Sequence, residues 1–268
     1  MIEFLVLFSC IFFLAFLVPW RYRNHCAVLG WTGMVLFLFA EIPYYLSINN
    51  ILYPVLAVLS VPFLAITAKH LLSGERLVEQ LSTAAAVAFL IYAPFAYTAL
   101  GDWLIAVVVD QTAAVHSLVG YPVEKLAWNL LSRNGFRVEI ILACTGVQAI
   151  AIMLGVVSAV RTTFRQKVLS FLLVVPVIYL LNIARNVGVI VAYSEQWFPY
   201  LPEVVGNGEL GYESFFWAHN VIAEGLALLL LIGIAWGLFS IIPDLARYAV
   251  DLVDLYLRDI RRAFGRDK

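Results

Sequence analysis

The chain has 268 residues, of which 63% are hydrophobic and 13% are charged, with a formal net charge of −1 and a mean hydropathy of +0.92. A soluble domain is nearer half apolar and about one quarter charged, so this composition indicates a polytopic membrane protein and excludes a broad basic surface for nucleic acid. Cys10, Cys26 and Cys144 are dispersed, which excludes a disulfide framework and a metal-ligand spacing. No phosphate-binding glycine loop is present, and we expect no metal and no cofactor.

Several apolar stretches approach or exceed the length of about 20 residues that a membrane-spanning helix needs. They are residues 2–20, 27–46, 51–68, 81–100, 138–160, 168–193 and 215–242. The first stretch lacks the basic start of a cleaved signal peptide and carries Glu3, so we interpret it as an anchor. The sequence therefore predicts an all-α fold, with about seven transmembrane helices forming a single transmembrane domain over residues 1–242.

Two further segments have a helical pattern that does not suit a span. Residues 103–119 are short and carry Asp110, Gln111 and His116, so we expect a helix that lies at the outer surface or re-enters the membrane. Residues 243–268 alternate apolar and charged residues at helical spacing. This pattern predicts a cytoplasmic amphipathic tail that is attracted to anionic lipid.

The distribution of lysine and arginine orients the predicted spans, because short cytoplasmic loops are enriched in both residues. With the N-terminus outside, Arg185 lies within a span and most other cations fall on the cytoplasmic side. The outer segments then hold only Lys125, Arg133 and Arg137. The segments 120–137 and 194–214 become outer loops, which could cover a substrate groove or could simply connect the spans.

Three reactive residues stand alone in apolar segments. At about 1.5 Å per residue, Cys144, Arg185 and His219 would lie about 9, 12 and 7 Å below the outer face. An arginine inside a membrane is costly, so by default it is functional or paired. A thiol, a guanidinium and an imidazole can together perform acyl transfer, in which the imidazole takes the thiol proton and the guanidinium holds the oxyanion.

The residues around this set have both functional and ordinary interpretations. Gly146 leaves room for a close approach near the thiol. Asn182, Asn186 and Asn220 could satisfy polar groups of the site, or could be ordinary interhelical hydrogen bonds. Glu224 could be a protonated acid, a partner of Arg185, or a group that tunes His219, and these alternatives stay open. Cys10 and Cys26 have the ordinary interpretation of packing residues, and His25, His70 and His116 that of interfacial residues.

Three short motifs, in order, resemble the exosortase/archaeosortase family: ACTGVQ at 143–148, NIARN at 182–186 and AHN at 218–220. The resemblance implies that Cys144 is the nucleophile, Arg185 the catalytic arginine and His219 the third catalytic group. It covers residues 80–242, which would form the catalytic core. The additional N-terminal spans, over residues 1–79, resemble the archaeosortase A branch of the family.

The resemblance implies a membrane cysteine transpeptidase in the plasma membrane of a prokaryote, and an archaeal one. Its partners would be the C-terminal sorting-signal helix of a secreted protein, with a short motif such as PGF, and a membrane lipid that receives the new C-terminus from a thioester on Cys144. Two alternatives remain. One is a transporter or channel with a polar path at Arg185 and His219, and the other is a lipid phosphatase or acyltransferase.

Overall fold

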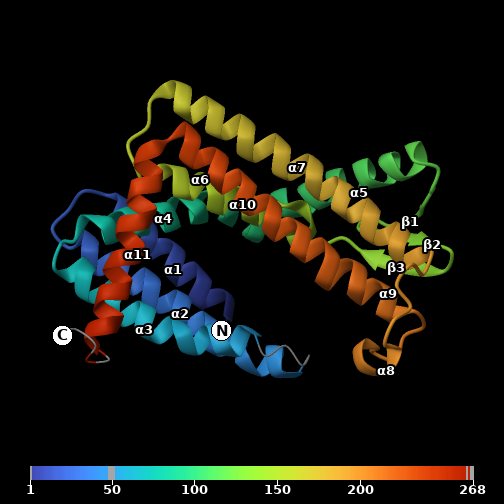
Figure 1. Cartoon of the computed structure of the whole chain (residues 1–268), viewed down its shortest axis with the longest axis horizontal. Helices are drawn as coiled ribbons and strands as arrows, with labels where there is room; N and C mark the ends of the chain where they lie inside the picture. The colour runs from blue at the N-terminus through green and yellow to red at the C-terminus, as the bar shows by residue number, and fades with distance from the viewer. Residues whose placement is uncertain (1, 48–51, 264, 266–268) are drawn as a thin grey trace. The chain divides into compact units, whose positions relative to one another are not determined.

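The structure, a computed structural model, describes residues 2–47, 52–263 and 265 and is predominantly helical (Figure 1). Within these residues, five helices are long and apolar enough to cross a membrane: Arg23–Leu46, Tyr53–Leu72, Arg76–Tyr97, Phe164–Ser194 and Tyr212–Ile241. The predicted fold class, an all-α membrane bundle, is confirmed. The start of the predicted span 51–68 and the end of the predicted tail 243–268 lie outside the described residues.

Two of the predicted spans are shorter than expected. The apolar helix within 2–20, α1 (Ile2–Leu17), ends just before Pro19, because proline cannot donate a backbone hydrogen bond and disfavours helical geometry in the residue before it. The segment 138–160 is not one helix. It contains the end of β3 (Phe136–Glu139), the 3₁₀-helix η1 (Leu142–Thr145) and the 12-residue helix α6 (Val147–Ser158).

The chain forms two compact units, and the first contains the N-terminal helices. It comprises Met1–Ile91, Leu154–Phe164 and Ile242–Lys268. Its elements include α1, α2 (Arg23–Ser47), α3 (Leu52–Leu72), most of α4 (Arg76–Tyr97) and α11 (Pro243–Ala263). One apolar core of this unit joins α1, α2, α3, α4 and α11 through the buried residues Phe16, Cys26, Ala27, Leu71, Val78 and Leu255.

The second unit contains the three short motifs and comprises Tyr92–Met153 and Arg165–Ile241. After α5 (Leu100–Leu118), β1 (Glu124–Ala127), β2 (Leu130–Arg133) and β3 come η1 and the start of α6. Then follow α7 (Phe164–Ser194), α8 (Pro202–Val205), α9 (Tyr212–Phe216), the π-helix η2 (Trp217–Ala223) and α10 (Glu224–Ile241). A core of α5, sheet and α7 side chains holds this unit together: Ile105, Val108, Val109, Leu131, Ile140 and Ile190.

The segment 120–137, predicted to be a loop, contributes most of a three-stranded antiparallel sheet with the order β1-β2-β3. β2 and β3 are joined by Asn134 and Gly135, whose φ angles are 52° and 85°, the combination that a two-residue hairpin turn requires. Arg133 forms an ion pair with Glu195 just after α7, with Nη2 2.5 Å from Oε1. This contact fastens the sheet to the end of the helix that carries Arg185.

The predicted helix 103–119 corresponds to α5, and the interfacial interpretation of His116 is wrong. His116 is fully buried, and its Nδ1 lies 3.0 Å from the carbonyl oxygen of Tyr121. Burial disfavours the charged imidazole, so it lowers the pKa of His116 below the ordinary value. This residue is therefore a neutral core group that fixes the chain where it leaves α5.

Candidate active site

Cys144 lies in a helical break, and not in the middle of a spanning helix as predicted. It belongs to η1, and its backbone N–H donates to the carbonyl of Ile141 over 2.8 Å. Gly146 follows with a left-handed φ of 80° and α6 begins at the next residue. A side chain is unfavourable at such a φ, so the glycine explains why an apolar stretch long enough to span the membrane is interrupted here.

The backbone around Cys144 is held by two asparagines of α7. The side-chain amides of Asn182 and Asn186 both donate to the Cys144 carbonyl oxygen, the latter over 2.9 Å. Asn182 and Asn186 are four residues apart and therefore share one face of α7 with Arg185. These bonds join α7 to the segment that contains Cys144, so both asparagines satisfy a polar backbone group of the candidate site.

Gly146 lies close to α7. A Cβ atom placed on Gly146 would lie 3.3 Å from Cγ2 of Ile178 and 3.4 Å from Cβ of Asn182. A side chain at this position would therefore press on the turn of α7 that binds the Cys144 carbonyl.

Arg185 and His219 are in direct contact, with Nη2 of Arg185 3.1 Å from Nε2 of His219. A guanidinium has no acceptor, so the arginine donates and Nε2 of the imidazole accepts. His219 Nδ1 then carries the proton and donates to Oδ1 of Asn220 over 2.7 Å. The ring of Phe215 stacks on the imidazole with centroids 5.0 Å apart. His219 is therefore a neutral imidazole of fixed orientation, and the lone pair of its Nε2 accepts a hydrogen bond from Arg185.

His219 and Asn220 lie on the π-helix η2, between the α-helical segments α9 and α10. A single π-turn within a helix is uncommon and frequently marks a functional site. It shifts the side chains on either side of it out of regular α-helical register. The sequence carries no clear signal for this turn, although the spacing of Phe215 and His219, one helical turn apart, could have indicated their stacking.

One pocket with a volume of about 550 Å³ joins the three motif segments of the second unit. The polar groups at its wall are Gln148, Asn182, Arg185 and Glu224, and Ala143 and Gly146 flank Cys144 there. The remaining lining is mostly small or aliphatic, with Trp197 and Phe198 from the loop after α7. The pocket lies along α7 and α10, which run side by side (Figure 1) and contact each other where Leu173 meets Gly237.

Ser214 holds the pocket's loop in place. It is fully buried, donates to the carbonyl of Ala192 over 2.9 Å, and accepts from the backbone N–H of Phe198 over 3.2 Å. Trp217 adds a second tie, because its indole N–H donates to the carbonyl of Tyr200 over 2.9 Å. The sequence analysis missed Ser214 and Phe198, because their residue types alone give no signal for this role.

The structure brings Arg185 and His219 together directly, and it joins Cys144 to them through its backbone. The Cys144 side chain is half-buried and packs against the apolar core beneath α5. In the part of the chain that the structure describes, the thiol makes no hydrogen bond to Arg185 or His219, and Glu224 forms no ion pair with Arg185. The site in this structure thus contains an arginine–histidine pair, and the Cys144 thiol is not hydrogen-bonded to it within the described residues.

Comparison with known proteins matches the chain to one family. The sequence model of the transmembrane exosortase family (Exosortase_EpsH) matches residues 2–207, which include Cys144 and Arg185. The chain is 27% identical to archaeosortase A of Natronomonas pharaonis over 253 residues, covering 86% of this chain and 80% of that relative. It is 26% identical to archaeosortase A of Haloferax volcanii over 266 residues, covering 89% and 88%.

No solved structure gives a significant match to the chain. The family match covers well over half of the sequence and includes its N-terminal helices as well as the motif segments. Together with the five helices able to cross a bilayer, it shows that this multi-pass membrane protein belongs to the transmembrane exosortase family.

Proposed function

We propose that this protein is a membrane cysteine transpeptidase of the archaeosortase type. It would cleave a C-terminal sorting signal from secreted proteins and transfer the new C-terminus to a membrane lipid. The observation that carries the proposal is the contact of Arg185 with His219 on the same face of α7 that binds the Cys144 carbonyl. Arg185 lines the pocket and contacts His219, and asparagines on the same face of α7 bind the Cys144 carbonyl. A thiol, a guanidinium and an imidazole are together suited to acyl transfer.

The first half of the reaction forms a thioester. His219 Nε2 takes the proton of the Cys144 thiol, and the sulfur attacks the carbonyl carbon of the scissile peptide bond. Arg185 donates to the oxyanion that forms on the carbonyl oxygen. When the guanidinium shifts toward this oxyanion, it no longer donates to His219 Nε2, so that nitrogen is free to accept a proton. The carbon–nitrogen bond then breaks, and the imidazolium returns the proton to the leaving amine.

The second half transfers the acyl group. A nucleophilic oxygen or nitrogen of a lipid headgroup attacks the thioester carbonyl and loses its proton to His219. The carbon–sulfur bond breaks, and the thiolate recovers that proton, so the enzyme returns to its starting state. The half-buried position of Cys144 supports transfer over hydrolysis, because exclusion of water protects a reactive thioester.

The shape of the pocket supports a helical substrate. Along α7 its wall runs from Ile178 to Ala192, a distance of about 20 Å. The small residues Ala184, Gly188 and Ala192 are spaced one turn apart on this wall, and small residues allow the backbone of a second helix to approach closely in a membrane. The substrate's transmembrane segment would lie here, with its cleavage motif at the Arg185 level.

The direction of the site follows from the charge distribution. Lys125, Arg133 and Arg137 lie in the segment between α5 and η1, whereas most other cations fall in segments that the same topology assigns to the cytoplasm. This bias supports an external N-terminus, a cytoplasmic C-terminus and a site that opens to the extracytoplasmic side.

The test is processing of a reporter that ends in a PGF-type motif, a transmembrane segment and a basic tail, co-expressed with the full chain. Cys144→Ala and Cys144→Ser should abolish the shift in reporter mass while the protein remains in the membrane. Cys10→Ala and Cys26→Ala are the matched controls, since both thiols are buried packing groups, and they should process normally. Normal processing by Cys144→Ala would refute the proposal.

A further inference from the structure

The last helix, α11, has three distinct faces. At about 100° per residue, Leu245, Tyr248 and Leu255 share a face that is buried against the first unit. The charged residues, mainly Arg247, Asp251, Asp254, Arg258 and Arg261, occupy a second face. A third face is apolar and uncovered: Val250, Val253, Leu257 and Ile260 are 60%, 56%, 42% and 39% exposed.

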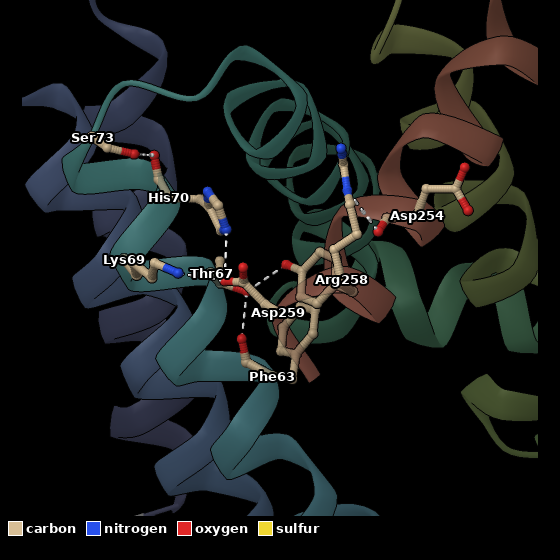
Figure 2. A network of polar contacts seen from close by, with 9 residues as sticks. Phe63, Thr67, Lys69, His70, Ser73, Asp254, Arg258 and Asp259 are labelled. Carbon is tan, nitrogen blue, oxygen red and sulfur yellow. Dashed lines mark hydrogen bonds and ion pairs between the residues drawn. The ribbon is translucent and has the colours of Figure 1, made fainter. Parts of the chain in front are cut away.

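Polar contacts fix the rotation of α11, so the exposed stripe cannot turn inward. Figure 2 shows the carboxylate of Asp259 facing the end of α3, where it accepts from Lys69 Nζ over 2.7 Å and contacts His70 Nε2 at 2.9 Å. The hydroxyls of Thr67 and Tyr256 are 2.6 Å apart. These contacts are supported by the stacking of Phe63 on Tyr256, with centroids 5.5 Å apart.

The position of these contacts shows that α11 crosses the ends of the spanning helices. On α3 the contacts with α11 fall between Phe63 and Leu71, and on α4 they include Leu77 and Val78 near its start. The contacting stretch of α11 extends over Tyr248–Asp259, about 17 Å. Figure 1 shows the same arrangement within this unit, with α11 running across the α3–α4 connection. A helix that crosses the ends of membrane spans lies along the membrane surface.

The uncovered stripe fits a bilayer better than it fits another helix. Its four side chains have heptad-like spacing, but a coiled coil needs this pattern over at least about three heptads. The α11 stripe covers less than two. The stripe borders a charged face that holds Arg258 and Arg261 together with Asp251 and Asp254. An apolar stripe beside a charged face with arginines is typical of helices that lie in the plane of a lipid surface.

We propose that α11 is a fixed interfacial anchor of the protein. One face is bound to α3 and α4, the stripe of Val250, Val253, Leu257 and Ile260 is immersed at the boundary of the acyl chains, and Arg258 and Arg261 face the phosphates of anionic lipids. The hollow beside them, of about 460 Å³ and lined by Leu77, Asp251, Asp254, Leu257, Arg258 and Arg261, lies toward the headgroups. The contacts to α3 distinguish this helix from a tail that binds membranes reversibly.

The test measures the depth of single spin labels in the full-length protein. Cys144→Ala removes the accessible thiol, whereas Cys10 and Cys26 are buried and label poorly. Cysteines are then introduced singly at Val253 and Leu257, with Asp251 and Arg247 on the same helix as matched controls. Each variant is reconstituted in vesicles made of equal parts phosphatidylcholine and phosphatidylglycerol, and a spin count on the Cys144→Ala parent corrects for residual label.

The measured quantity is the ratio of oxygen collisions to collisions with a water-soluble nickel chelate at each label. We expect this ratio to be several-fold higher at positions 253 and 257 than at positions 251 and 247. Equal access of the nickel chelate to all four positions would overturn the proposal, because the stripe would then face water. Strong immobilisation at 253 and 257 with poor access for both reagents would also overturn it, since the stripe would then be covered by protein, such as a second copy of this chain.

Discussion

At the scale of single residues, the site is organised around the backbone of Cys144 as much as around its thiol. Asn186 is 5% exposed and donates to the Cys144 carbonyl over 2.9 Å. The same face of α7 carries Arg185, whose guanidinium contacts His219. The Cys144 backbone and the guanidinium are thereby held by one helix, so in the proposed mechanism the asparagines are positioning residues.

Asn186→Asp should separate positioning from folding. Aspartate has nearly the same shape but, when ionised, cannot donate to a carbonyl, so we expect kcat to fall about tenfold with little change in KM. Lowering the pH within the range where the enzyme stays active should partly restore kcat, because a protonated carboxyl regains one donor. Asn207→Asp, a matched change at an exposed position whose Oδ1 accepts from the backbone N–H of Glu209, should leave kcat unchanged. A fall in thermal stability with unaltered kinetics would contradict the positioning role.

Arg185→Lys tests the geometry of the guanidinium. The guanidinium can donate to His219 Nε2 at rest and to the oxyanion during reaction, whereas an ammonium is a point charge without the planar fork. We expect the processing rate to fall about 10²–10³-fold, measured as reporter cleavage over time with equal amounts of protein in the membrane. A rate close to that of the wild type would show that only the charge matters.

At the scale of elements, the spanning helices were predictable and the breaks between them were not. Long apolar runs such as 168–193 leave few alternatives to a helix, and α7 is found there. The segment 138–160 has the same composition, but the left-handed Gly146 and the bonds from α7 interrupt it. Those bonds are tertiary contacts, which hydropathy does not report. The Asn134–Gly135 turn, by contrast, was a local signal for the β-hairpin that went unused.

Gly146→Ala tests the break before α6. Alanine at a φ of 80° is strained, and its Cβ would meet Ile178 and Asn182, so we expect a loss of stability of about 1–2 kcal/mol and a larger loss of activity. Gly233→Ala is the control, because a Cβ there meets nothing within 4 Å. Thermal unfolding in detergent and reporter processing measure the two effects, and equal results for both variants would contradict this account.

The docking of α11 should depend on pH through Asp259. Hydrogen bonds from Lys69 and then His70 lower the pKa of Asp259 below its ordinary value of 3.8. Its contribution to stability is therefore present above that value and is lost as the pH falls through the lower, folded-state pKa. Asp259→Asn should lower the free energy of unfolding at neutral pH by about 1 kcal/mol, which is seen as a lower melting temperature. In acid, the melting temperatures of the variant and the wild type should become equal. Asp254→Asn, at an exposed site on α11, should change the melting temperature neither at neutral pH nor in acid.

At the scale of the whole molecule, the charge bias predicts one orientation in the membrane. Single cysteines at Lys125 and Arg137, in the segment before η1, should react with a membrane-impermeant maleimide added to intact cells, because the proposed topology places that segment outside. A cysteine at Arg258 should react only after the membrane is opened. The opposite pattern of labelling would reverse the topology, and with it the proposed opening of the site to the extracytoplasmic side.

The claim on which the other functional arguments depend is covalent catalysis by Cys144. The most direct measurement is mass spectrometry of the purified protein during turnover of a sorting-signal substrate, with rapid acid quenching. The account predicts an adduct with the mass of the cleaved substrate, attached to the peptide that contains Cys144, released by hydroxylamine and absent in Cys144→Ala. Continued processing with Cys144 unmodified throughout, or an adduct on Cys10 or Cys26 instead, would contradict it.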